Sequence, residues 1–132
     1  MYSEEHGTFA TDVGCIDGRT REPILAWARK NIDAEWADTV TRPGMDGFLL
    51  SEINPVILED LQKQVLVSVE KHNSKYILVS GHCECAGNPV SEDEHRTCIV
   101  KAVRVVRSWN LPEDVKVIGL LVNAQWQAEQ II

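Results

Sequence analysis

Hydrophobic residues along the chain form two patterns, short near-continuous runs and longer stretches with helical spacing. The short runs predict four strands, at Phe9–Ile16, Trp36–Thr41, Lys75–Gly81 and Val115–Val122. The stretches between them predict three helices, over Glu22–Ile32, from Asn54 to about His72, and from Ser91 onward. Strands and helices therefore alternate along the chain.

Local signals support these elements. Asn54 and Pro55 suit the cap and first position of a helix, and Ser91 with Glu94 makes a capping-box pattern. The run Tyr76-Ile-Leu-Val is apolar on both faces, which is typical of a central parallel strand. We therefore predict an α/β fold with a mostly parallel four-stranded sheet, helices on both faces and right-handed crossovers. Residues 1–132 contain no linker or repeat and are expected to form a single domain.

Two short motifs follow predicted strands. Cys15-Ile-Asp17-Gly-Arg19 comes at the end of the first strand and His82-Cys-Glu-Cys85 directly after the third. Ligands of parallel sheets bind at the carboxyl ends of the strands, near the point where strand order reverses. If the first and third strands are neighbours, Cys15 meets His82 and Cys85. Two sulfurs and one imidazole suit zinc, and three protein ligands leave a fourth position open, as in catalytic sites.

Asp17 and Arg19 lie beside these ligands. A guanidinium holds a carboxylate ionised and fixes its orientation, so Asp17 could accept a hydrogen bond from water or hydroxide on the metal. The same carboxylate could instead become the fourth ligand if Arg19 released it. A structural ion pair without a catalytic role is a third interpretation.

Composition narrows the function classes. The 132-residue chain is 44% hydrophobic and 25% charged, and its net charge of −7 disfavours general binding to nucleic acid or anionic membranes. The N-terminus has no signal-peptide pattern, and no stretch approaches the ~20 apolar residues that span a bilayer. We expect a cytoplasmic protein whose four cysteines bind metal or do chemistry rather than form disulfides.

The motifs Cys15-x-Asp17-x-Arg19 and Gly81-His82-x-x-Cys85, in this order of strands and helices, resemble the β-class carbonic anhydrases. The resemblance implies one zinc ion per chain on Cys15, His82 and Cys85, and a catalytic pair of Asp17 and Arg19. It implies reversible hydration of carbon dioxide to bicarbonate by zinc-bound hydroxide. It also implies a homodimer or larger homo-oligomer with active sites near the subunit interface.

The chain departs from the family pattern in three places. Only residues 1–8 precede the first strand, where the family usually has a longer helical arm that wraps the partner. Ala86 separates Cys85 from a glycine that usually follows directly, and Arg42-Pro43-Gly44 replaces an Arg-Asn-Ala-Gly-like stretch. The resemblance is therefore to a compact, divergent member.

Two other functions fit the same motifs. One is a non-catalytic zinc domain in which Asp17 closes the metal site, and the other is a related hydrolase of carbon disulfide or carbonyl sulfide. A redox or metal-sensing role for Cys83 and Cys85 is a weaker third hypothesis.

The remaining candidate residues receive structural interpretations. We predict that Cys83 points away from the metal and that Cys98 packs in or near the core. Asn88-Pro89 should form a turn over the site, and the tryptophans should serve core or interface packing. Three histidines have no partner pattern and are expected to be solvated: His6, His72 and His95.

Overall fold

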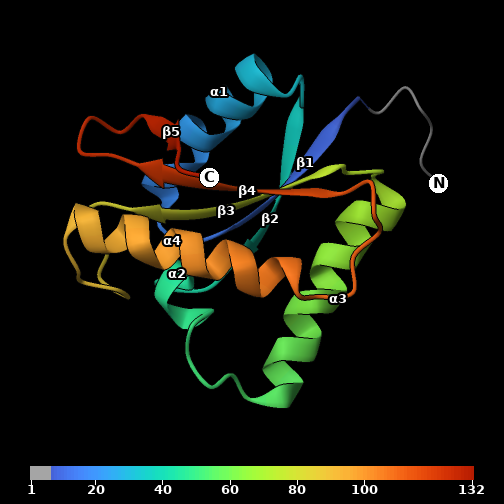
Figure 1. Cartoon of the computed structure of the whole chain (residues 1–132). Helices are drawn as coiled ribbons and strands as arrows, with labels where there is room; N and C mark the ends of the chain where they lie inside the picture. The colour runs from blue at the N-terminus through green and yellow to red at the C-terminus, as the bar shows by residue number, and fades with distance from the viewer. Residues whose placement is uncertain (1–6) are drawn as a thin grey trace.

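The computed structural model describes residues 7–132. Its centre is a sheet of five strands in the order β2-β1-β3-β4-β5 (Figure 1). The strands are β1 (Phe9–Gly14), β2 (Trp36–Thr41), β3 (Tyr76–His82), β4 (Lys116–Val122) and β5 (Ala128–Gln130). The first four are parallel, and β5 runs antiparallel to β4. The predicted α/β class is confirmed, and the four predicted strands lie within one or two residues of their expected bounds.

Helices cover both faces of the sheet, as predicted. Helix α1 (Arg21–Asn31) lies on one face, and α2 (Met45–Phe48), α3 (Pro55–Lys71) and α4 (Glu92–Arg107) lie on the other (Figure 1). Each face has its own apolar core, and burying these two cores is what holds the layers together. No helix within residues 7–132 is long and apolar enough to cross a membrane.

The helix starts follow the local signals. The Asn54 side chain accepts a hydrogen bond from the backbone N–H of Val56, and Pro55 occupies the first turn of α3. The Ser91 hydroxyl accepts from the backbone N–H of Glu94 at the start of α4. Both predicted caps are confirmed.

Two elements were missed by the sequence analysis. Strand β5 has three residues, Ala-Glu-Gln, which is too short and too polar to show a hydrophobic period. The four-residue helix α2 begins after Gly44, whose φ is +61°. A Cβ on Gly44 would lie 2.4 Å from the carbonyl carbon of Gly87, so this turn requires glycine. Helix α2 depends on a contact distant in sequence, whereas β5 depends on pairing with the preceding strand β4.

The sheet order brings the two motifs to one edge. Strand β1 pairs with β3, with Thr11 opposite Ile77 and Val13 opposite Val79. The chain passes from β1 outward to β2 and then returns to β3 on the other side, so strand order reverses between β1 and β3. The loops after these two strands leave the sheet side by side, which is the condition for Cys15 to meet His82 and Cys85.

Candidate metal centre

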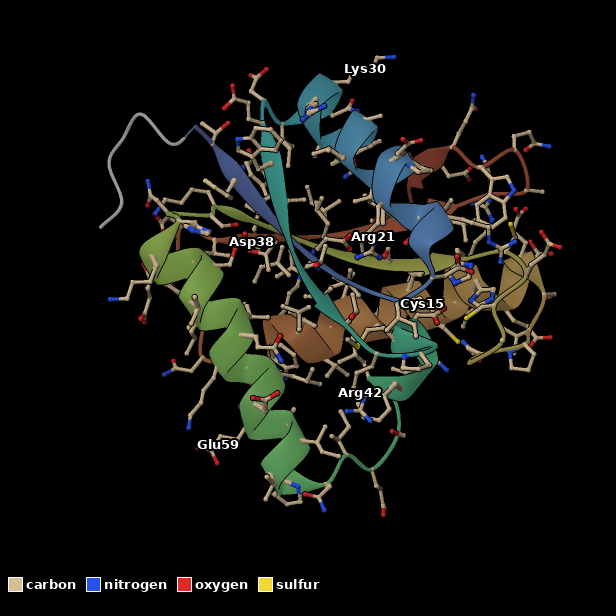
Figure 2. All side chains as sticks on the ribbon, turned by 180° about the vertical axis from the view of Figure 1, so that it is seen from behind. Cys15, Arg21, Lys30, Asp38, Arg42 and Glu59 are labelled. Carbon is tan, nitrogen blue, oxygen red and sulfur yellow. The ribbon has the colours of Figure 1, made fainter. Side chains whose placement is uncertain are left out.

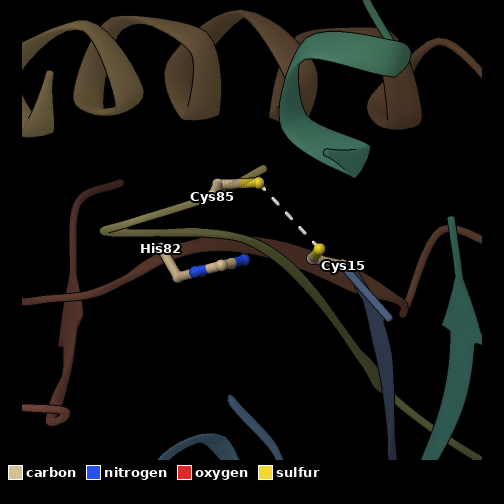
Figure 3. Close-up of side chains that lie close together, drawn as sticks. All are labelled: Cys15, His82 and Cys85. Atoms are coloured by element: carbon tan, nitrogen blue, oxygen red, sulfur yellow. Dashed lines mark hydrogen bonds between the residues drawn. The ribbon is translucent and has the colours of Figure 1, made fainter. Parts of the chain in front are cut away.

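Cys15, His82 and Cys85 converge at the carboxyl edge of the sheet. Cys15 directly follows β1, His82 is the last residue of β3, and Cys85 lies in the loop after it. All three side chains are buried, point toward one another (Figure 3), and have ligand atoms within 4.8 Å of one another. The Cys15 and Cys85 sulfurs are 4.0 Å apart. A tetrahedral centre with ~2.3 Å zinc–sulfur bonds would place its sulfurs about 3.8 Å apart.

The imidazole of His82 is oriented for metal binding. Its Nδ1 lies 2.6 Å from the carbonyl oxygen of Cys83, which fixes Nδ1 as the protonated nitrogen. The opposite nitrogen, Nε2, is buried and has no hydrogen-bond partner among residues 7–132. A buried acceptor without a donor is costly, and a metal ion would satisfy it. The ring therefore fits a metal ligand.

The two thiols have an environment that favours a cation between them. Burial raises the pKa of the Cys85 thiol, and the nearby Cys15 raises it further, while the backbone amides of Asn88 and Gly87 oppose this shift. The backbone N–H of Gly44 donates to the Cys15 sulfur at 3.4 Å. Two close buried thiolates need positive charge, and a divalent metal ion would supply it. The three side chains thus fit a metal by geometry and by charge.

Asp17 and Arg19 form a bidentate ion pair next to this group. Arg19 Nη2 donates to Asp17 Oδ2 at 2.7 Å, Arg19 Nε lies 3.1 Å from Oδ1, and the Arg19 backbone N–H donates to Oδ1 at 2.9 Å. The side-chain hydrogen bond from Arg19 lowers the pKa of Asp17 to about 2. Asp17 Oδ2 is 3.9 Å from His82 Nε2. An ionised carboxylate is therefore held beside the metal position, where at neutral pH it can accept a hydrogen bond while staying unprotonated.

A buried network connects the metal loops from the other side. His95 Nδ1 lies 2.6 Å from Asp46 Oδ2, and Asn88 Nδ2 donates to Asp46 Oδ1 at 3.1 Å. His95 and Asp46 are almost fully buried, so the prediction that His95 is solvated is wrong. The loop residue Asn88 thus ties the Cys85 loop to α2. Sequence spacing could not show this pair, because Asp46 belongs to the helix that the sequence analysis missed.

The other predicted side chains have mixed outcomes. His72 is half-buried, stacks on Phe9 and lies 2.6 Å from Asp38, so its prediction as solvated is also wrong. His6 lies outside the described residues. The Cys83 thiol donates to the Asn123 carbonyl at 3.3 Å and is not part of the metal group. Cys98 is half-buried beside Asn88, and the four cysteines are free thiols.

A second ion pair underlies the Cys15 loop. Arg21 Nη1 lies 3.5 Å from Asp12 Oδ2, and Arg21 Nη2 donates to the Cys15 carbonyl at 2.7 Å (Figure 2). Burial raises the pKa of Asp12 to about 6, against the opposing effects of Arg21 and Ser80. The sequence does not predict this pair, because an aspartate inside an apolar strand has no local signal that identifies its partner.

The raised pKa of Asp12 should make the free energy of unfolding depend on pH. Since its pKa is raised in the folded state, the folded protein binds the proton more tightly than the unfolded chain, and stability falls as pH rises from about 4 to 6. The loss is about 3 kcal/mol at most. Asp12→Asn should flatten this part of the profile, measured by urea unfolding of metal-free protein between pH 4 and 7. The exposed-residue control Asp60→Asn should follow the wild-type curve, and an Asp12→Asn profile as steep as wild type would contradict the prediction.

A family model described as "Putative carbonic anhydrase" matches residues 5–132. The chain belongs to this family. Its solved structural neighbours include a carbonic anhydrase from Glaciozyma antarctica, with a TM-score of 0.62, 11% identity and coverage of 92% of this chain and 81% of that one. The β-carbonic anhydrase CafA of Aspergillus fumigatus has a TM-score of 0.55 and 15% identity, covering 95% of this chain and 75% of that one.

An apo carbon disulfide hydrolase is also similar, with a TM-score of 0.60, 12% identity and coverage of 93% of this chain and 78% of that one. No curated protein matches the sequence significantly. At such low identities the solved structures establish a shared fold. Together with the family match they confirm the resemblance to β-class carbonic anhydrases and make this chain a divergent member. The carbonic anhydrase family supports a lyase-type enzyme at the family level, with a Cys15, His82 and Cys85 group that could hold a metal ion.

Proposed function

We propose that this carbonic anhydrase family member is a zinc-dependent lyase that catalyses the reversible hydration of carbon dioxide to bicarbonate. One zinc ion per chain would be held by Cys15, His82 and Cys85. The observation that carries the proposal is the buried His82 Nε2, which has no hydrogen-bond partner among the described residues and lies close to two thiols and an arginine-held carboxylate. That arrangement has metal ligands on one side and a fixed hydrogen-bond acceptor on the other.

Each protein group has a distinct part in this chemistry. Zinc, when bound, supplies the Lewis acidity that makes water nucleophilic near neutral pH. Two thiolates reduce that acidity, because they cancel the formal charge of the ion. Asp17 compensates by accepting a hydrogen bond in a fixed direction, since its pKa of about 2 keeps it ionised and Arg19 holds both of its oxygens. Aligning the nucleophile in this way lowers the entropic part of the barrier.

Stopped-flow hydration of carbon dioxide tests the proposal. Zinc-loaded protein should accelerate hydration above the buffer rate, and protein stripped with a chelator should return to the buffer rate and recover on adding zinc. Metal content is measured on the same samples. A buffer-level rate at full zinc occupancy would rule out this activity.

A non-catalytic zinc domain is the second candidate. It is favoured by the 3.9 Å separation of Asp17 Oδ2 and His82 Nε2, which places a carboxylate oxygen close enough to become the fourth metal ligand. In that case zinc would contribute folding free energy directly, chelation would unfold the domain, and no exchangeable water would be detected on the metal. Thermal unfolding with and without chelator separates this candidate from the lyase.

Hydrolysis of carbon disulfide or carbonyl sulfide would use the same groups, since both are small linear molecules with an electrophilic carbon. The fold likeness to a carbon disulfide hydrolase makes these the first alternative substrates to assay. Hydrogen sulfide release by zinc-loaded protein, without carbon dioxide hydration, would favour this reaction.

We further propose a cytoplasmic homodimer. Strand β2 lies at the edge of the sheet, and Trp36 on this strand is 47% exposed, which leaves an edge suited to a second copy. Free thiols at all four cysteines suit a reducing compartment. Sedimentation equilibrium would report the oligomer, and a monomer at all protein concentrations would exclude the dimer.

A further inference from the structure

Trp126 lies against the face of the Arg19 guanidinium. The Arg19 Cζ atom is 4.3 Å from the centroid of the Trp126 ring, and the same ring is 6.3 Å from the imidazole of His82. Asp17 binds Arg19 through its N–H groups, whereas Trp126 contacts it over the ring face. A cation over an indole face is attracted by the ring electrons. Arg19 is therefore held by two neighbours of different kinds.

The turn between β4 and β5 is built to hold this tryptophan. Trp126 has a φ of +57°, a left-handed conformation that a bulky residue rarely adopts and that persists only where the surroundings impose it. Asn123 imposes it: its carbonyl accepts from the Trp126 backbone N–H at 2.9 Å, and its side-chain oxygen accepts from the N–H groups of Gln125 and Gln127. Strand β5 then pairs with β4 directly after the turn. The turn thus fixes the backbone from which the indole ring extends over Arg19.

The position of Arg19 determines where the Asp17 carboxylate lies. Its Oδ2 atom is 3.9 Å from His82 Nε2, so the carboxylate lies close enough to the metal group to become a ligand if Arg19 moved away. Arg19 is half-exposed, and its contacts with Glu84 are long: 3.4 Å from Nη2 to the Glu84 carbonyl oxygen and 3.8 Å from Nη1 to the exposed Glu84 carboxylate. Solvent competes for the half-exposed guanidinium, so the ion pair with Asp17 alone does not hold Arg19 in place all the time.

We propose that Trp126 is a positioning residue that keeps Arg19 on Asp17 and thereby keeps Asp17 from closing the metal site. This proposal rests on the proposed metal site but not on its turnover. It gives β5 and its turn a function, since they place the indole ring over a guanidinium that belongs to a loop distant in sequence.

The first test needs no metal. In metal-free protein, hydrogen exchange at Arg19 Nε–H, followed by NMR, reports how long the guanidinium stays on Asp17. Trp126→Leu should speed this exchange by roughly two- to fivefold, the range expected for losing an exposed cation–π contact. Trp126→Phe keeps an aromatic face and should restore part of the protection. This variant separates loss of the cation–π contact from a local folding defect. Exchange unchanged in Trp126→Leu would overturn the proposal.

Trp36→Leu is the matched control. Trp36 is also a tryptophan beside an arginine, with the Arg29 Cζ atom 5.3 Å from its ring. It is more exposed than the half-buried Trp126 and lies at the start of β2, outside the metal group. This variant should leave the exchange of Arg19 Nε–H at the wild-type rate. An equal acceleration in Trp36→Leu and Trp126→Leu would show a general loss of stability and would overturn the proposal.

The second test uses Co²⁺ in the site and follows water-proton relaxation, which reports exchangeable water on the metal. Trp126→Leu should lose part of the wild-type relaxation enhancement, and the double variant Trp126→Leu, Asp17→Asn should regain it, because asparagine is a much weaker metal ligand. Full enhancement in Trp126→Leu would contradict the proposal. Neither test uses a substrate, so wild-type protein that fails to hydrate carbon dioxide would count against the proposed function alone.

Discussion

Replacing Cys85 by serine is expected to remove metal from the protein and abolish its activity. The Cys85 sulfur is buried 4.0 Å from the Cys15 sulfur, and a serine hydroxyl is neither deprotonated at neutral pH nor long enough to replace it. Changes that merely surround a ligand lower metal affinity about 10- to 100-fold, so loss of a ligand should exceed a hundredfold. Zinc content after dialysis and competition with a chromophoric chelator measure the effect.

Cys83→Ser is the control for this experiment. Cys83 is two positions away in the same loop, but its thiol donates to the Asn123 carbonyl and does not face the metal group. A serine hydroxyl can make the same hydrogen bond, so this variant should keep wild-type zinc content. Zinc retained by Cys85→Ser and lost by Cys83→Ser would show that the ligands have been assigned to the wrong cysteine.

Asp17→Asn is expected to lower turnover strongly while zinc stays bound. An asparagine keeps the shape of Asp17 but loses the charge that Arg19 stabilises, and its amide can present a donor where an acceptor is needed. Losing an acceptor that aligns the nucleophile costs about 10²-fold in rate. Stopped-flow rates and zinc content on the same sample separate the loss of chemistry from the loss of metal.

The matched control is Asp114→Asn. Asp114 also pairs with a cation, Lys75, at 2.6 Å, and that pair likewise lowers the pKa of its carboxyl, but it is exposed and remote from the metal group. This variant should keep wild-type turnover. If Asp17→Asn instead released zinc, Asp17 would be a metal ligand and the non-catalytic candidate would gain support.

Most of the fold could be predicted from the sequence, because most of the signals for strands and helices are local. Apolar runs and capping residues such as Asn54 and Ser91 act within a few positions, so they located strands and helix starts to within a residue or two. Asp17 and Arg19 are also close in sequence, two positions apart in one turn, so their pairing could be predicted from the sequence. The motifs also led to the carbonic anhydrase family, which the family match confirmed.

Pairs between distant segments could not be predicted. His95 was expected to be solvated, yet it is buried against Asp46, which lies on a helix too short to leave a pattern. Asp12 finds Arg21 only because the end of β1 and the start of α1 meet in the fold. A polar residue in a sequence shows what it can bind, and packing decides what it does bind.

The sequence by itself determined the layers of this protein and the identity of its candidate ligands, since hydrophobic period and side-chain chemistry are properties of short segments. Only the tertiary structure decided that the ligands meet, because that required β1 and β3 to be neighbours in the sheet. It also decided that no donor within residues 7–132 reaches His82 Nε2 and that Trp126 covers Arg19. These contacts join residues far apart in the chain, and the free energy of burying both faces of the sheet is what brings them together.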